Sequence, residues 1–155
     1  MKHISKLLIV IIVLSLVFSV CSCTRVTSIA RDIPRAVEFA ANLASLAKIG
    51  NTEEALAQGE QYLHPKSNLN IEKVRELIKE NEAIKSLNLE GSAKQISVGN
   101  IGTPSYKEYS EELGGNIYEV TAVVTIDGHP LNVAIQILSD EAMMGLYSFD
   151  ITLAN

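Results

Sequence analysis

The stretch NIYEVTAVVTIDGHPLNVAIQIL, residues 116–138, decides the fold, because apolar and polar residues alternate through most of its length. In its first half every second residue is apolar, and these residues would share one face of a strand. They are Tyr118, Val120, Ala122, Val124 and Ile126. The tetrapeptide DGHP, residues 127–130, supplies a turn, and the alternation then resumes at Leu131, Val133, Ile135 and Ile137. The stretch predicts a β-hairpin with one apolar and one polar face.

Two further segments flank this hairpin. The closing segment GLYSFDITL, residues 145–153, alternates in the same way, with Tyr147 and Phe149 on its apolar side, and predicts a last strand. Upstream, AKQISVGNI, residues 93–101, predicts a first strand. Between the first strand and the hairpin, GTPSYKEYSEELGGN, residues 102–116, is typical of a polar loop or a bulged connection. The sequence therefore predicts about four antiparallel strands.

Before the strands, apolar residues recur at helical spacing. Asp32 is suited to cap a first helix with Pro34 in its first turn, and Gly50 ends that helix. Thr52 caps a second helix over residues 53–63, and Asn70 caps a third over residues 71–84. Helices followed by antiparallel strands indicate an α+β fold, with the helices packed on one face of the sheet.

This order of elements resembles the small bacterial lipoproteins of the NTF2-like superfamily, in particular their lumazine-binding-like domains. The resemblance is carried by LASLAKIGNTEEALAQGEQYLHPKS (residues 43–67), by AIKSLNLEG (residues 83–91), and by the hairpin with its closing strand. It covers nearly the whole chain after residue 22. It implies one domain over residues 32–155, in which helices pack on a curved antiparallel sheet that forms a cone around a pocket, as in NTF2-like and cystatin-like folds.

The N-terminus has the pattern of a bacterial export signal. A basic start with Lys2 and Lys6 precedes an uncharged run over residues 7–20, which is shorter than the ~20 residues of a membrane-spanning helix. The tetrapeptide VCSC, residues 20–23, resembles a lipobox, in which a cysteine receives a lipid. Cys23 is the better acceptor because the small Ser22 precedes it, whereas the bulkier Val20 precedes Cys21.

These features predict a signal peptide over residues 1–22 and a membrane-proximal tether over residues 23–31. The expected location is outside the cytoplasm, with the lipid on Cys23 in the cell membrane or the outer membrane. Plain secretion after cleavage and a retained anchor helix are the alternatives. Of the 13 Lys and Arg, two lie in the signal, so 11 basic residues remain against 18 acidic ones. This acidic balance argues against binding to nucleic acid.

Few residues of the sequence carry the marks of catalysis. His64 and His129 stand beside prolines in expected turns, and no Cys or His pair has the spacing of a metal site, so neither a metal nor a cofactor is expected. No nucleophile elbow and no phosphate loop is present. Some enzymes of the NTF2-like superfamily are isomerases that use a tyrosine and acidic groups, so the resemblance makes Tyr118 a possible catalytic residue. By alternation, however, Glu119 and Asp150 fall on the opposite face.

The sequence therefore indicates a non-catalytic binding or interaction module, and an isomerase-like enzyme is the less favoured alternative. One hypothesis is that the cone binds a small apolar molecule, with Phe39, Tyr118, Tyr147 and Phe149 lining the pocket. The other is that the polar face of the sheet pairs with a second copy or with another envelope protein. That face carries Glu119, Thr121, Thr125, Asn132, Gln136 and Asp150.

Overall fold

The computed structural model describes residues 27–49, 52–88 and 95–154. The signal peptide predicted over residues 1–22, both cysteines and the first part of the predicted tether lie outside these residues. The chain divides into two compact units, residues 1–32 and residues 33–155. In the first unit, residues 27–32 are helical, and the buried Asp32 accepts a contact from Arg31, with 3.3 Å between Nε and Oδ1.

The first helix includes residues 27–45 and is followed by the short 3-10 helix η1 (Leu46–Lys48). The prediction that this helix begins at an Asp32 cap is wrong, because residues 27–31, expected in the tether, are already helical. Ala30 and Arg31 are good helix formers, so the helix extends upstream of the predicted cap. Pro34 removes one backbone hydrogen bond from the interior of the helix but does not end it.

The second and third predicted helices are present, with one difference. α2 (Thr52–Gly59) and η2 (Glu60–Tyr62) occupy the second, and η3 (Pro65–Ser67) follows. Asn70 caps α3 (Ile71–Glu80) as predicted, because its Oδ1 accepts the backbone N–H of Lys73 at 2.8 Å. The third helix, however, breaks at Asn81, which has an extended ψ of 125° and caps a separate α4 (Glu82–Ser86) through Ile84 N–H.

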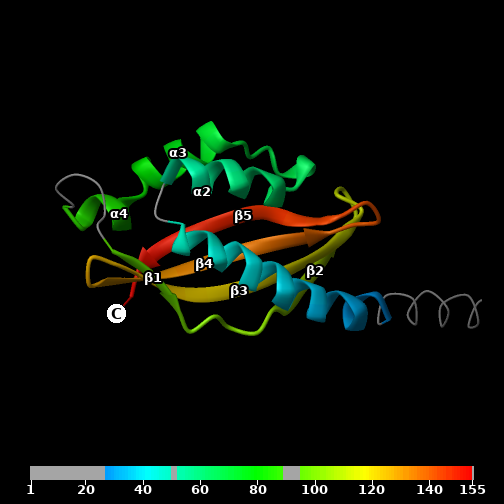
Figure 1. Cartoon of the computed structure of the whole chain (residues 1–155). Helices are drawn as coiled ribbons and strands as arrows, with labels where there is room; N and C mark the ends of the chain where they lie inside the picture. The colour runs from blue at the N-terminus through cyan, green and yellow to red at the C-terminus, as the bar shows by residue number, and fades with distance from the viewer. Residues whose placement is uncertain (1–26, 50–51, 89–94, 155) are drawn as a thin grey trace, which may run out of the picture. The chain divides into compact units, whose positions relative to one another are not determined.

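The sheet has five antiparallel strands: β1 (Ile96–Gly99), β2 (Ser105–Ser110), β3 (Gly115–Ile126), β4 (His129–Ser139) and β5 (Met144–Leu153). β1 and β2 pair with the two halves of β3 along one edge, and β4 and β5 continue the sheet on the other side (Figure 1). The α+β class is confirmed. The expectation of a loop over residues 102–116 is wrong where β2 lies, because pairing with β3 satisfies the backbone there even though most β2 side chains are exposed and polar.

The predicted hairpin is confirmed, with its register and its turn. Tyr118 lies opposite Ile137, and Val124 lies opposite Leu131, so the apolar residues share one face, called here the inner face. Asp127 and Gly128 form a two-residue turn with φ of 48° and 86°, the left-handed backbone that tight hairpins need. Asp127 also fixes the start of β1, because its backbone N–H donates to the Gln95 carbonyl while its Oδ1 accepts the Gln95 N–H.

The closing strand is confirmed but is not regular. A register shift between Gln136 and Ile137 makes Leu146 the partner of Ile137, whereas Phe149 pairs with Ile135. Tyr147 is the extra residue at this bulge. The simple alternation that assigned Tyr147 and Phe149 to one series is therefore interrupted at Tyr147.

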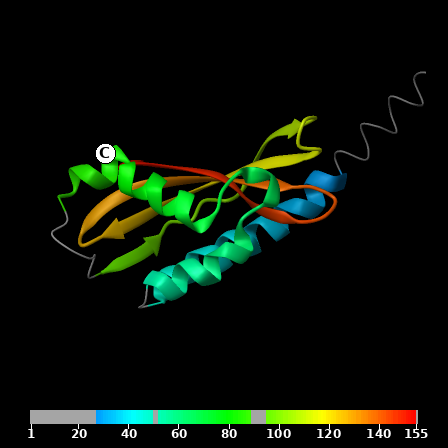
Figure 2. The same cartoon turned by 90° about the horizontal axis from the view of Figure 1, so that it is seen from above.

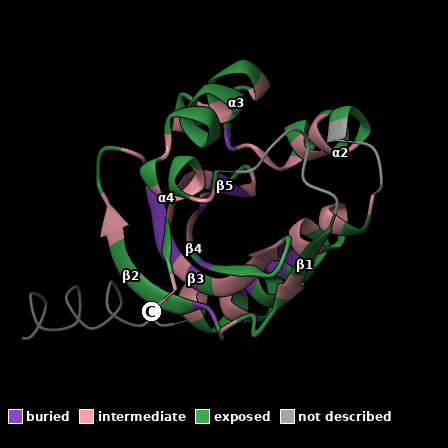
Figure 3. Cartoon of the chain, turned by 90° about the vertical axis from the view of Figure 1, so that its left-hand side faces the viewer, coloured by how far each residue is buried: buried purple, intermediate pink, exposed green. Residues whose placement is uncertain are grey.

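The helices cover the inner face and one edge of the sheet. α2 and η2 run alongside the first helix (Figure 2), and Phe39 packs edge-to-face on Tyr62 with ring centroids 5.6 Å apart. α3 and α4 lie along β5 (Figure 1), where Asn81 Nδ2 donates to the Ile151 carbonyl at 3.0 Å. Exposed residues dominate α3 and β2, while the buried ones gather in the strands (Figure 3). None of the described helices is both long and apolar enough to span a bilayer.

Candidate functional site

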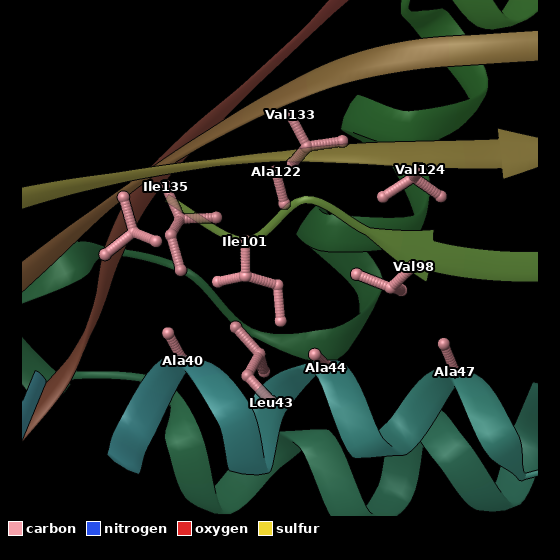
Figure 4. Close-up of a pocket in the computed structure, with 11 residues that line it drawn as sticks. Ala40, Leu43, Ala44, Ala47, Val98, Ile101, Ala122, Val124, Val133 and Ile135 are labelled. Atoms are coloured by element: carbon pink, nitrogen blue, oxygen red, sulfur yellow. The ribbon is translucent and has the colours of Figure 1, made fainter. Parts of the chain in front are cut away.

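A cavity of about 170 Å³ lies between the C-terminal half of the first helix and the inner face of the sheet. Its wall is formed by the first helix with η1, by strands β1, β3 and β4, and by Ile101, which follows β1. Every side chain in this wall is a hydrocarbon (Figure 4). The lining residues are Ala40, Leu43, Ala44, Ala47, Val98, Ile101, Val120, Ala122, Val124, Val133 and Ile135.

The cavity follows from side-chain size on two facing periodic surfaces. Ala40 and Ala44 lie on one face of the first helix, since residues four apart line up along it, and Ala47 follows them in η1. Their methyl groups are too short to reach the sheet. Opposite them, Ala122 stands in the middle of β3, where a larger residue would have closed the gap. Val124, Val133 and Ile135 are consequently only half-buried although they belong to the inner face.

The cavity continues into an outer groove of about 370 Å³. The two share Ala44, Ala47, Val98 and Ile101. At the groove, Ile96 and Ile101 expose 46% and 44% of their surface, which is unusual for isoleucine. The groove also contains the first polar groups of the site, which belong to Ser45, Lys48 and Ser97. We call the region of the cavity and groove the open end of the sheet.

The other end of the sheet, where β4 turns into β5, is packed tightly, and we call it the closed end. Tyr118, Ile137 and Leu138 are fully buried there. Gly145 lies so close to the chain at His64 that an added Cβ would stand 2.9 Å from three His64 atoms. This approach lets the His64 N–H donate to the Leu146 carbonyl at 2.9 Å and join the helical segment to β5.

A charged cluster of His64, Lys66 and Asp140 secures the closed end. The Asp140 carboxylate, whose side chain is 6% exposed, lies 2.6 Å from Lys66 Nζ and 3.5 Å from His64 Nε2. Its Oδ1 accepts the backbone N–H groups of Ala142 and Met143 at 2.9 Å. Burial raises the pKa of this carboxyl, but the hydrogen bond from Lys66 and those from the Met143 and Ala142 N–H groups outweigh burial and hold the pKa well below its usual range.

The hydrogen bonds of His64 define its protonation geometry. Nδ1 accepts the Lys66 backbone N–H at 3.2 Å, so the proton of the neutral ring is on Nε2, which faces Asp140. Among the described residues, neither Nε2 nor the buried Ser139 Oγ forms a hydrogen bond. None of the residues that line the cavity belongs to this cluster, so we assign the cluster to holding η3 against the β4–β5 turn.

The four residues expected to line a pocket are not brought together around the cavity. Phe39 packs on Tyr62 and borders a shallow hollow beside Met143 and Met144. Tyr118 is buried at the closed end, edge-to-face with Tyr106. Tyr147 and Phe149 are half-buried on β5. The cavity that the structure describes is walled by smaller aliphatic residues instead.

The polar face of the sheet lies opposite the cavity, as the register requires. Glu119 pairs with Gln136, and Asp150 pairs with Ala134, which in turn pairs with Thr121. Lys107 Nζ lies 3.2 Å from Glu119 Oε1, and Ser148 Oγ donates to Gln136 Oε1 at 2.8 Å. These polar side chains satisfy one another across neighbouring strands.

Sequence reasoning missed the two features that distinguish the ends of the sheet. The sequence predicts a turn at His64, and its position next to Pro65 and three residues before Ser67 is the one indication that the backbone there has a fixed conformation. Asp140 begins the turn between β4 and β5, and an aspartate is common in such turns because its side chain accepts backbone N–H groups. The sequence does not indicate that His64 and Lys66 are its other neighbours. Ala40, Ala44 and Ala47 follow the helical spacing of apolar residues, but this spacing does not indicate how much space their small side chains leave open.

Comparison with known proteins adds no relative to this description: no family model, curated protein or solved structure matches the chain. Within residues 27–49, 52–88 and 95–154, no group of three His, Cys, Asp or Glu side chains is arranged to hold a metal ion.

Proposed function

We propose that this protein is a non-catalytic binding module of the bacterial cell envelope, anchored by a lipid on Cys23, which holds a small apolar molecule between its first helix and its sheet. The observation that carries the proposal is the cavity of about 170 Å³ with a wall made of hydrocarbon alone. The lipobox-like VCSC supports the anchor, and the α+β arrangement of helices before an antiparallel sheet is compatible with an NTF2-like fold.

An apolar cavity of this size favours an apolar occupant over water. A buried water needs two to four polar partners, and an engineered cavity of about 150 Å³ lined by Leu, Ile and Phe stays dry and takes up benzene or xenon. Here the wall likewise offers no hydrogen-bond partner. Moving apolar surface out of water contributes roughly 25 cal/mol per Å², so a small hydrocarbon gains by entering.

The same wall supports a binding role over a catalytic one. A reaction needs a nucleophile, a proton donor or acceptor, or a charge-stabilising group at the bound molecule. The eleven side chains that line the cavity are alanine, valine, leucine and isoleucine. The ionisable cluster of His64, Lys66 and Asp140 lies at the closed end and does not line it.

The experiment is native mass spectrometry of the exported protein carrying Cys23→Ser, purified without detergent. This substitution removes the acyl group, which would otherwise compete for an apolar site. We expect the protein with an unchanged cavity to show a mass excess of small-molecule size. The excess should be lost in Ala44→Leu, which places a larger side chain in the cavity. Ala57→Leu, at an exposed alanine of α2, is the matched control and should keep the excess.

A protein without excess mass, which also fails to take up added decanol, would contradict the proposal. In that case a clean dimer or a complex with another protein would move the function to the polar face of the sheet. Introduction of a negative charge on that face by Gln136→Glu would then weaken the association.

A further inference from the structure

The cavity and the groove differ in chemistry, and the difference indicates what kind of molecule fits both. All the side chains in the wall of the inner part are apolar, and the polar side chains of the site, those of Ser45, Lys48 and Ser97, lie in the groove. Because the two share Ala44, Ala47, Val98 and Ile101, one molecule can occupy them together. A ligand that matches this gradient has an apolar body and one polar end.

The site is long in the direction of the helix. Its helical lining extends from Ala40 to Ala47, seven residues, which corresponds to about 10 Å at ~1.5 Å per residue. The groove adds Lys48 directly beyond Ala47. An elongated apolar space beside a helix suits a hydrocarbon chain lying along it better than a compact ring system.

The polar end of the site is positively charged. Lys48 contributes the only ionic group among the described residues of the groove, and Ser45 and Ser97 add hydroxyl groups that can donate hydrogen bonds. Lys48 is exposed, and no carboxylate of the described residues forms an ion pair with it. The chain has a formal charge of −5, and a lysine at the mouth of an apolar site, without an ion-pair partner among the described residues, is complementary to an anion.

We propose that the ligand is a single-chain fatty acid whose hydrocarbon tail fills the cavity and whose carboxylate lies at Lys48. This inference rests on the proposed function and adds the class of ligand and the direction in which it binds. One cation and two hydroxyls match a monoanionic head. The tail enters past Ile96 and Ile101, and its end reaches Ala40, where the helix is buried.

The test compares the affinities of ligands with one ten-carbon tail and different heads, measured by titration calorimetry on the exported Cys23→Ser protein. Decanoate should bind more tightly than decanol, and decylammonium should bind least. Decyl phosphate distinguishes a carboxylate site from one for a phospholipid-type head, and we expect it to bind no more tightly than decanoate. Ala40→Leu, which blocks the inner end of the cavity, should weaken all four by more than tenfold.

The decisive variant is Lys48→Met, which keeps an apolar stem but removes the charge. We expect it to weaken decanoate about fivefold, the range of an exposed ion pair, and to leave decanol unchanged. Lys79→Met, at an exposed lysine of α3, should change neither. Equal affinities for decanol and decanoate, with no effect of Lys48→Met, would overturn the fatty-acid inference but leave the proposed function intact. Tighter binding of decyl phosphate would overturn the carboxylate assignment, and no binding of any decyl compound would overturn both the inference and the proposed function.

Discussion

The two ends of the sheet share one alternating pattern but reach opposite packing. At the closed end, Tyr118 and Ile137 on the inner face are fully buried. At the open end, Val124 and Val133 continue the same face and remain half-exposed. The small Ala122 of β3 contributes to the contrast, and the elements that cover the sheet contribute the rest. Where His64 approaches within contact of Gly145 the space is closed, and where alanines of the helix face the sheet it stays open.

This contrast separates the residues that stabilise the fold from those that shape a site. Packing to native density leaves no room for added atoms. The closed end should therefore respond to a single methyl group, whereas the open end should accept several. Substitutions at matched residue types in the two regions test this directly.

The largest effect is expected for Gly145→Ala at the closed end. Its Cβ would stand 2.9 Å from the backbone of His64, which cannot move without breaking its bond to Leu146. We expect a loss of about 2–3 kcal/mol in the free energy of unfolding, measured by urea denaturation. Gly99→Ala in β1 is the control at the open end, since nothing lies within 4 Å of its Cβ. Equal losses in both variants would show that the ends do not differ in packing.

The next effect concerns the charged cluster. Asp140→Asn removes the ion pair with Lys66 while it keeps an oxygen for the turn, and we expect a loss of about 1–2 kcal/mol at pH 7. Because folding lowers the Asp140 pKa, its contribution is fully present above the unfolded value near 4. It should disappear as the pH falls below 4 toward the folded pKa.

Urea denaturation of both proteins between pH 2 and 7 measures this dependence. The wild type and Asp140→Asn should converge in stability in the acidic range. The same substitution at Asp150, on the exposed face of β5, is the control and should leave the wild-type dependence in place. A constant difference between wild type and Asp140→Asn across the whole range would contradict the role of the carboxylate charge.

A smaller effect, opposite in sign at the two positions, is expected along the first helix. Ala44→Leu fills empty space and should stabilise the protein by about 1 kcal/mol. Ala36→Leu, two turns earlier at a fully buried position outside the cavity wall, should destabilise it by a similar amount or more. Melting temperatures read by circular dichroism suffice. Destabilisation by both would mean that the cavity is too narrow for a leucine side chain.

The smallest effect is expected on the polar face, which belongs to neither end. Lys107→Met removes the cross-strand pair with Glu119, and such exposed pairs contribute about 0–1 kcal/mol. We expect a change within about 0.5 kcal/mol, together with a smaller salt dependence of stability than in the wild type. A larger change would indicate that this face is covered by another molecule in solution.

The sequence predicted well those features that depend on local periodicity. The hairpin, its Asp127–Gly128 turn, the Asn70 cap and the α+β class all follow from neighbours a few residues apart. It failed where the outcome depends on distant partners. β2 becomes a strand because β3 offers an unpaired edge, and the third helix breaks at Asn81, whose side chain reaches Ile151.

The cavity described by the structure has other lining residues than those expected for a pocket from the sequence. An apolar space between helix and sheet was one of the two hypotheses, and aromatic residues were expected to line it. Aromatic side chains are large, however, so they fill space, as Tyr118 does at the closed end. The cavity is left instead by Ala40, Ala44 and Ala47, and only the distance between helix and sheet reveals what their small size leaves open.

The contacts along β5 have a consequence for the behaviour of the protein at high concentration. The outer edge of a sheet offers N–H and C=O groups that can pair with strands of other molecules and start aggregates. On β5, the His64 N–H occupies the Leu146 carbonyl, and the Asn81 amide occupies the Ile151 carbonyl. Growth of an aggregate from this side would first have to displace both. At the opposite edge, β2 carries Lys107 and Glu108, whose charges disfavour edge-to-edge pairing of identical strands. Self-association is therefore resisted by hydrogen bonds at one edge of the sheet and by charge at the other.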